Sequence, residues 1–426
     1  MSLSATSTGS TEHGASLIDA MRHLARRMLG PLVALWMFAG GFVLIEPSPY
    51  ELVFIMVLPV AILAGVGLHK QPQILLYLLI LFAPFGMIGA FQVTHMPTYK
   101  GVFYVLVTIF LWLTGYFAAN YVADDPDRNM TRMMKAYTIV AVLVAAVGSL
   151  AYLGLIPGKD IFTRYGRAKG TFEDPNVFGP FLILPAMYAL QAILLKGRKG
   201  LLRNAAILGV LAAGVFFSFS RAAWGHLLIS GLLVFLFVYL FESTKKIRAR
   251  MVFLILIGVG VGVVGLAAIL SIGPVRDLFL QRANLVQSYD SGETGRFGRQ
   301  AYAFELALNN PIGIGPLEFE NLRIVEEPHD TYVKVLLTYG WMGGLAYYIL
   351  VILTLHRGYS ALVRQPRYRL WLIPLVAVFT FLVIESAIID SDHWRHYFLV
   401  IGMIWGVTAY ADRKQDPMRA DMRAIQ

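Results

Sequence analysis

The sequence predicts an all-α membrane protein, a polytopic bundle of about 12 transmembrane helices with one long outer loop that contains a short helix. Of the 426 residues, 57% are hydrophobic and only 15% are charged, whereas soluble domains are under half apolar and about a quarter charged. Apolar runs long enough to cross a bilayer recur along the chain, and cysteine is absent. These observations exclude a soluble enzyme and a disulfide-stapled domain.

The N-terminal residues 1–30 are predicted to form a cytoplasmic tail. Residues 1–16 are rich in Ser, Thr and Gly, which is typical of a disordered segment. Residues 17–29 have the pattern of a short basic amphipathic helix at the membrane surface. No small-residue cleavage site follows the first apolar run, so we expect that run to be retained as a span.

Twelve apolar runs separated by polar breaks are predicted to cross the membrane, nine within residues 31–272 and three within 332–411. They are residues 31–46, 50–68, 73–91, 101–122, 135–155, 177–195, 204–219, 222–241, 251–272, 332–355, 370–389 and 397–411. About two thirds of the Lys and Arg residues fall on alternate loops and on the two tails, 1–30 and 412–426. The positive-inside rule therefore places both termini in the cytoplasm. The net charge of +10 arises from the basic residues of these cytoplasmic loops and tails, so no nucleic-acid partner is predicted.

Two outer segments are too long to be simple turns. The first covers residues 156–176, and the second covers residues 273–331, in which we expect residues 302–309 to be helical. Loops of the second length are usually functional in compact proteins, so we expect residues 273–331 to carry catalytic elements.

Arg221 lies between two apolar runs, in a gap too short for an ordinary loop. An arginine near the membrane surface is costly unless it faces a polar cavity or a partner. Its guanidinium can bind two phosphate oxygens at once, so Arg221 is a candidate anion clamp. The alternative is an arginine at a helix end whose charge extends to water.

Arg296 and Arg299 lie just before the predicted helix of the long loop. Residues three apart occupy neighbouring positions on one side of a helix. The pair is a candidate second phosphate contact, and the alternative is a solvated pair of surface charges.

His329 ends the long loop, and Asp330 is a plausible N-cap of the apolar helix that follows. The positive end of that helix disfavours a protonated imidazole, which would leave the ring able to accept a proton. Glu326 and Glu327 act in the opposite direction and could orient the ring. His329 is therefore a candidate general base, although a lone histidine is often structural.

The first long outer segment carries Arg164, Arg167 and Lys169 beside Glu173 and Asp174. Mixed charge is ordinary for a solvated loop. The three basic residues are nonetheless further candidate contacts for a sugar or a phosphate, together with Asp330.

Two other patterns are explained without a cofactor. Residues 260–265 spell a dinucleotide-binding fingerprint, but they lie inside an apolar run with no preceding strand, and Gly258 and Gly262 indicate close helix packing instead. Residues 390–396 contain two aspartates and two histidines that could hold a divalent metal, yet turn formation explains them equally well. No metal or other cofactor is predicted.

Several motifs occur in a characteristic order. His329-Asp330 is followed, after nine residues, by Gly340-Trp341-Met342-Gly343. Upstream stand Gly295-Arg296, a Pro-x-Gly-x-Gly turn at residues 311–315, Ser220-Arg221, and residues 170–176. Together they resemble the O-antigen ligase and O-antigen polymerase superfamily of bacterial polytopic membrane glycosyltransferases. The family pattern has Asn, Ser or Gly where this chain has Asp330.

The resemblance implies an enzyme of the bacterial inner (cytoplasmic) membrane with a periplasmic active site in the long loop. It would move a glycan from undecaprenyl diphosphate to an acceptor hydroxyl by a metal-independent inverting displacement. His329 would draw the acceptor proton, while Arg221 and one or both of Arg296 and Arg299 would hold the diphosphate. The lipid tail of the donor would enter sideways from the outer leaflet.

Three functions fit this description. A ligase would use lipid A core as its acceptor, and the modest size of the chain and its single long outer loop slightly favour this function. A polysaccharide polymerase for O-antigen or exopolysaccharide would use the growing carrier-linked chain. A transporter or flippase for a lipid-linked sugar would place its charged residues near the bilayer midplane, whereas the candidates here gather at the outer face.

Overall fold

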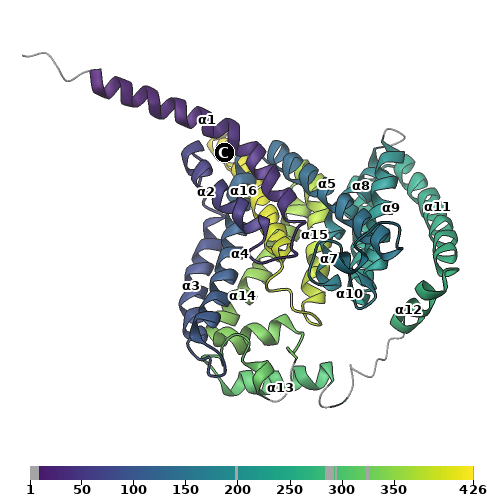
Figure 1. Cartoon of the computed structure of the whole chain (residues 1–426). Coiled ribbons are helices and arrows are strands. Elements are labelled where there is room, and N and C mark those ends of the chain that lie inside the picture. The colour runs from purple at the N-terminus through teal and green to yellow at the C-terminus, as the bar shows by residue number, and fades with distance from the viewer. Residues whose placement is uncertain (1–8, 197–199, 284–291, 293–294, 323–325, 426) are drawn as a thin grey trace, which may run out of the picture.

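The computed structural model describes residues 9–196, 200–283, 292, 295–322 and 326–425, with side chains described from residue 18 to residue 412. The chain is helical along most of this length, with one small two-stranded sheet (Figure 1). The elements are α1 Gly9–Ala39, α2 Pro49–Ala64, α3 Gln73–Ala90, α4 Thr98–Asp124, α5 Pro126–Tyr152, α6 Lys159–Phe162, β1 Thr163–Arg164, β2 Arg167–Ala168, α7 Pro175–Phe181, α8 Ile183–Leu195, α9 Leu201–Phe217, α10 Arg221–Phe237, η1 Val238–Glu242, α11 Lys245–Leu270, α12 Gly273–Ala283, α13 Arg296–Asn309, η2 Phe319–Asn321, α14 Thr331–Arg364, η3 Pro366–Tyr368, α15 Arg369–Glu385 and α16 Arg395–Ile425.

The predicted all-α membrane architecture is confirmed. By length and composition, 8 helical segments of the described residues could cross a membrane: α3, α4, α5, α7 with α8, α10 with η1, α11, α14, and η3 with α15. The apolar helices α2 and α9 are shorter, and α1 and α16 contain the first and last predicted runs. The total of twelve spans stays a prediction.

Three boundaries differ from the expectation. The predicted surface helix at residues 17–29 and the first span form one continuous helix, α1, which already includes residues 9–16. Residues 1–8 lie outside the described residues. At the other end, α16 continues through the predicted tail to Ile425. Adding residues to an existing helix is much easier than nucleating a new one, so both terminal spans extend beyond their apolar runs.

Glycines set the closeness of packing in the bundle. On α16, a Cβ atom at Gly406 would lie 2.6 Å from the carbonyl oxygen of Ala119 in α4, so the absence of side chains lets these two backbones approach. In α11, by contrast, Gly258 and Gly262 have no neighbour within 4 Å. The predicted close packing of α11 is therefore wrong within this chain, and α11 runs along the edge of the bundle (Figure 1).

The two glycine motifs of the sequence pack against each other. Gly340 interrupts α14 with φ 72°, a conformation that glycine adopts without strain. Its Cβ position would lie 2.6 Å from the carbonyl oxygen of Pro311, and Trp341 donates a backbone hydrogen bond of 2.9 Å to the same oxygen. This contact fastens the loop after α13 to α14.

The helix α13 covers one end of the bundle, which we call the α13 end (Figure 1). Ala303 and Ala307 of α13 form a small buried cluster with Leu337 of α14. The carboxylate of Glu318 accepts hydrogen bonds from the backbone N–H groups of Thr94 and His95, at 2.8 and 2.9 Å. The long loop is thereby attached both to α14 and to the connection between α3 and α4.

Candidate functional site

The start of α14 determines where His329 lies. Asp330 caps the helix, as predicted: its carboxylate accepts hydrogen bonds from the backbone N–H groups of Tyr332 (2.9 Å) and Val333 (3.2 Å). His329 has φ 53°, which is uncommon for a residue with a side chain. Its carbonyl oxygen accepts a hydrogen bond of 3.1 Å from the Gln300 side chain of α13. The backbone that carries the imidazole is therefore fixed on both sides.

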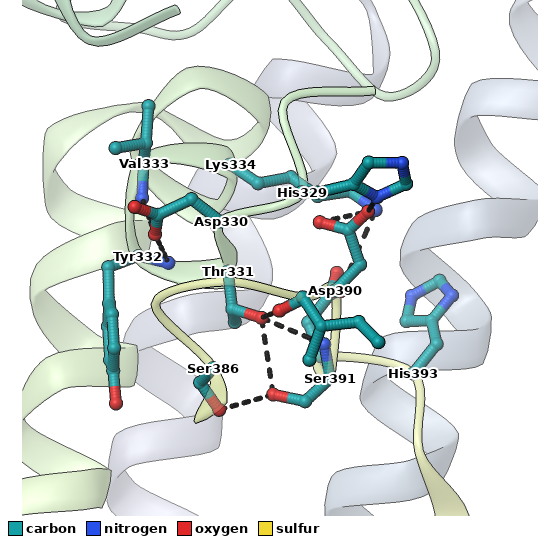
Figure 2. A network of polar contacts seen from close by, with 12 residues as sticks. His329, Asp330, Thr331, Tyr332, Val333, Lys334, Ser386, Asp390, Ser391 and His393 are labelled. Atoms are coloured by element: carbon teal, nitrogen blue, oxygen red, sulfur yellow. Dashed lines mark hydrogen bonds and ion pairs between the residues drawn. The ribbon is translucent and has the colours of Figure 1, made fainter. Parts of the chain in front are cut away.

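The imidazole of His329 pairs with Asp390, in the loop between α15 and α16. Its Nδ1 lies 3.0 Å from Oδ2 of Asp390, and the ring side chain is 37% exposed. An ionised carboxylate can only accept a hydrogen bond, so Nδ1 carries the proton. Figure 2 shows the other ring nitrogen, Nε2, directed away from Asp390, where it can accept a proton from another molecule.

Lys334 keeps the carboxylate of Asp390 ionised. Burial alone would raise the pKa of Asp390, but the nearby Lys334 and the hydrogen bond from His329 outweigh this effect and hold that pKa below its usual value. The Lys334 ammonium lies 3.8 Å from Oδ1 of Asp390 and 3.7 Å from Oδ1 of Asp392. A buried cation thus stabilises the negative charge that orients the imidazole.

The loop that carries Asp390 is tied to the first turn of α14 (Figure 2). The backbone N–H of Thr331 donates to the carbonyl oxygen of Ser386 at 2.8 Å. The hydroxyl of Thr331 donates to the carbonyl oxygen of Ile389 and accepts from the N–H of Ser391, both at 2.8 Å. These bonds fix the position of Asp390 relative to His329.

The sequence did not indicate this partner, since 61 residues separate His329 from Asp390. Glu326 and Glu327 were the predicted orienting residues, but the carboxylate that bonds the ring is that of Asp390. The available signal was the run of polar residues at 390–396, which the predicted topology placed on the same side of the membrane as His329.

Arg299 is buried and paired. Its side chain is 5% exposed and donates a hydrogen bond to the carboxylate of Glu326, which lowers the pKa of Glu326. The alternative of a solvated surface pair is therefore wrong for Arg299. Arg296 is the first residue of α13, one turn before Gln300, whose side chain holds the carbonyl of His329. Residues four apart share a helix face, so Arg296 lies on the same face of α13 as Gln300, the face that contacts the backbone of His329.

Arg221 is the first residue of α10, and the hydroxyl of Ser220 caps that helix. One turn further, the buried side chain of His226 lies 3.1 Å from the buried carboxylate of Glu385 at the end of α15. Glu385 directly precedes Ser386, which bonds the first residue of α14. This series of contacts brings Arg221 to the α13 end of the bundle. That the three arginines and His329 share one pocket stays a prediction.

The other basic candidates lie apart from His329 in the contacts that define them. Arg167 is 6% exposed, and its guanidinium donates at 2.7 Å to the carbonyl oxygen of Ser218 and at 2.7 Å to the side chain of Asn176. Arg167 is therefore an anchor for the turn that precedes Arg221, not a solvated loop residue. Arg164 is exposed and donates to the carbonyl oxygen of Glu173, while burial lowers the pKa of Lys169.

Within the described residues, no group of three or more His, Asp or Glu side chains could hold a metal ion. In the segment 390–396, which the sequence offered as a possible metal site, Asp390 forms a hydrogen bond with His329 and Asp392 forms an ion pair with Lys334.

Residues 206–348 match the family model described as O-Antigen ligase. These residues, about a third of the chain, are similar to the O-antigen ligase family. The matched O-antigen ligase segment runs from α9 into α14 and contains Arg221, Arg296, Arg299, His329 and the break at Gly340. A comparison with curated proteins found no match.

The O-antigen ligase superfamily supports, in general terms, a glycosyltransferase-like activity in lipopolysaccharide biosynthesis, with a lipid-linked glycan and lipid A core as partners. The apolar helices and the family match together point to a multi-pass membrane protein. Asp390 lies outside the matched residues, so its pairing with His329 is a finding of the structure alone.

Proposed function

We propose that the protein is a ligase that transfers a glycan from undecaprenyl diphosphate to a hydroxyl of lipid A core. The transfer takes place on the periplasmic side of the inner membrane, and the α13 end of the bundle faces the periplasm. The observation that carries the proposal is the His329–Asp390 pair, in which the carboxylate holds Nδ1 and leaves Nε2 directed outward. This arrangement suits a general base at neutral pH.

In the proposed reaction the acceptor hydroxyl attacks the anomeric carbon from the face opposite the diphosphate. The new carbon–oxygen bond forms as the bond to the diphosphate breaks, and the electron pair of the broken bond leaves with the diphosphate. The acceptor proton passes to Nε2 of His329. The resulting imidazolium is stabilised by Asp390, whose carboxylate stays ionised beside Lys334.

A diphosphate is a weak base and leaves most easily when positive charge is already placed around it. Arg221, Arg296 and Arg299 supply that charge in the proposal. Arg299 is already bonded to Glu326, so its charge is partly compensated and its contribution includes holding α13 in place. Arg221 and Arg296, at the N-terminal ends of α10 and α13, also add their charge to the positive ends of two helices.

The test uses purified protein in lipid vesicles with a carrier-linked glycan and lipid A core. Formation of glycosylated lipid A core, with release of undecaprenyl diphosphate, is the expected result. Glycan lengthened on its carrier would identify a polymerase instead. Movement of the carrier lipid across the bilayer without any transfer would overturn the enzyme assignment.

A further inference from the structure

A cavity of about 840 Å³ lies along the first half of α4, a size typical of small-molecule sites. Its apolar lining comes mostly from α4 and includes Phe103, Leu106 and Leu111. Phe103 is 64% exposed and Leu106 is 49% exposed, so the cavity opens on the surface that a transmembrane helix presents to lipid. We call it the α4 groove.

The α4 groove is amphipathic along its length. Its polar lining lies at the α13 end and comes from Lys100, Glu46, His393 and Arg395. Its apolar residues follow down α4 as far as Leu111. The helix rises about 18 Å over the twelve steps from position 99 to position 111. One leaflet of a bilayer is about 15 Å thick in its hydrocarbon part. The groove therefore has the depth and the polarity of a single leaflet.

A continuous set of polar contacts joins the wall of the groove to His329. Tyr104, which lines the groove, donates a hydrogen bond of 3.3 Å to Asp392. Asp392 contacts Lys334, and Lys334 contacts Asp390, which holds the imidazole of His329. The groove thus approaches the candidate base from the side of its carboxylates.

The two sides of His329 differ in charge. The arginines of the proposed diphosphate site belong to α10 and α13. On the side of the groove, the carboxylates of Asp390 and Asp392 share the ammonium of Lys334, and burial lowers the pKa of His393 to about 4, so that its side chain is uncharged at neutral pH. This side therefore lacks the concentrated positive charge that a diphosphate needs, whereas sugar hydroxyls can donate hydrogen bonds to carboxylates.

The donor and the acceptor differ in how their lipid is attached. In the donor, the isoprenoid chain is bonded directly to the diphosphate, so the chain begins where the arginines hold that group. In the acceptor, several sugars separate the lipid chains from the reacting hydroxyl. Only the acceptor can place its chains in the α4 groove and its sugars beside His329.

The charge at the mouth of the groove also favours a phosphorylated lipid. Arg395 is paired with Glu46 and Glu51, at 2.7 and 2.6 Å. Lys100 forms no ion pair with any residue that the structure describes. It is therefore the cation that a lipid phosphate would meet on entering the groove.

We propose that the α4 groove binds the acyl chains of the acceptor, a phosphorylated glycolipid of the lipid A type, with Lys100 at its phosphate. This inference rests on the proposed function and adds to it the place from which the acceptor approaches His329. The groove selects acyl chains of a membrane lipid and leaves the isoprenoid chain of the donor on the opposite side of the base.

The first experiment narrows the groove. Leu106→Trp places a larger side chain in its lining, and Leu143→Trp is the matched control, because Leu143 is 44% exposed at a similar depth on α5. Because the larger indole takes space from the acyl chains, Leu106→Trp should raise the KM for lipid A core about fivefold or more. The KM for the carrier-linked donor should stay within about twofold, and Leu143→Trp should change neither value. A rise in the donor KM alone, or no change in either KM for Leu106→Trp, would overturn the proposal.

The second experiment needs no turnover. Photoreactive benzoylphenylalanine is placed at position 106 or, as control, at position 143, and the protein is reconstituted in phosphatidylethanolamine and phosphatidylglycerol vesicles with traces of radiolabelled lipid A. Labelled lipid A should crosslink at position 106 and not at position 143, and excess undecaprenyl diphosphate should not compete. Equal crosslinking at both positions, or loss of the signal with undecaprenyl diphosphate, refutes the proposal.

The two experiments separate the groove from the reaction. Specific crosslinking in a protein that transfers no glycan would support the lipid A groove and refute the proposed ligase function. Transfer without specific crosslinking would support the ligase function and refute the groove. In the same vesicles, Lys100→Gln should reduce crosslinking of phosphorylated lipid A by about threefold or more and leave that of the dephosphorylated lipid unchanged. Equal crosslinking of both lipids by wild type would exclude a role for the phosphate.

Discussion

Replacing Asp390 by Asn tests the orientation of the imidazole. The substitution keeps the size of the side chain but removes its negative charge. An asparagine can turn its amide and donate a hydrogen bond to Nδ1 of His329. The proton would then move to Nε2, which could no longer accept the proton of the acceptor. An amide also gives less stabilisation than a carboxylate to the imidazolium that forms during the reaction.

The size of the effect follows from the contact. A hydrogen bond to a charged group contributes about 1.5–3 kcal/mol, which corresponds to about 10- to 150-fold in rate. The imidazole is 37% exposed, so water screens part of this interaction. We therefore expect kcat for Asp390→Asn to fall about 10- to 50-fold, with little change in the KM for the donor.

The assay is the initial rate of glycan transfer in vesicles. Asp392→Asn is the control, since Asp392 contacts Lys334 but not His329, and it should show a smaller loss of kcat. Thermal unfolding of both variants identifies any loss caused by misfolding. An unchanged kcat in Asp390→Asn would contradict the proposed role of Asp390.

Three further predictions address stability and phosphate binding. Gly340→Ala should lower the free energy of unfolding by about 1–3 kcal/mol or more, because Gly340 has φ 72° and a carbonyl oxygen lies 2.6 Å from its Cβ position. The control is Gly262→Ala, since a Cβ atom there would have no neighbour within 4 Å. In thermal unfolding, this control should stay within about 1 kcal/mol of wild type. Burial raises the pKa of Glu327 from 4.5 to about 7, so its ionisation costs stability as the pH rises between these values. Glu327→Gln should therefore unfold at a higher temperature than wild type at pH 8 and not at pH 4. A higher unfolding temperature at pH 4 alone would contradict the predicted direction of the pH dependence. Arg221→Lys should lower kcat about tenfold or more, because an ammonium cannot bind two phosphate oxygens in the fork geometry; near-normal transfer would argue against the clamp.

Local features of the fold followed from the sequence. Each predicted apolar run overlaps one or two helices, the predicted helix at residues 302–309 is part of α13, and Asp330 caps α14. Each depends on hydrophobic periodicity or on side chains within a few residues of each other. The sequence alone also singled out His329 and Arg221, because an ionisable residue at a membrane boundary needs a polar partner or a function. The glycine turn was identified only through the family resemblance.

Contacts between distant segments could not be predicted. The pairing of His329 with Asp390 depends on the loop after α15 being tied to α14 through Thr331, and no local pattern encodes that. The glycines of α11 have the spacing of a packed interface, yet they lie on a surface without neighbours. A pattern of small residues permits close packing but does not supply the partner. The inward position of Arg167 was missed for the same reason, since its partner Ser218 is 51 residues away.

In the proposed reaction, His329 takes the acceptor proton during glycan transfer. The most direct measurement compares single-turnover transfer to lipid A core by wild type and by His329→Ala, each saturated with carrier-linked donor in vesicles. We predict a rate lower by about 10²- to 10⁴-fold for His329→Ala, the contribution typical of general-base catalysis, with donor binding retained. A rate equal to that of wild type would exclude His329 as the general base.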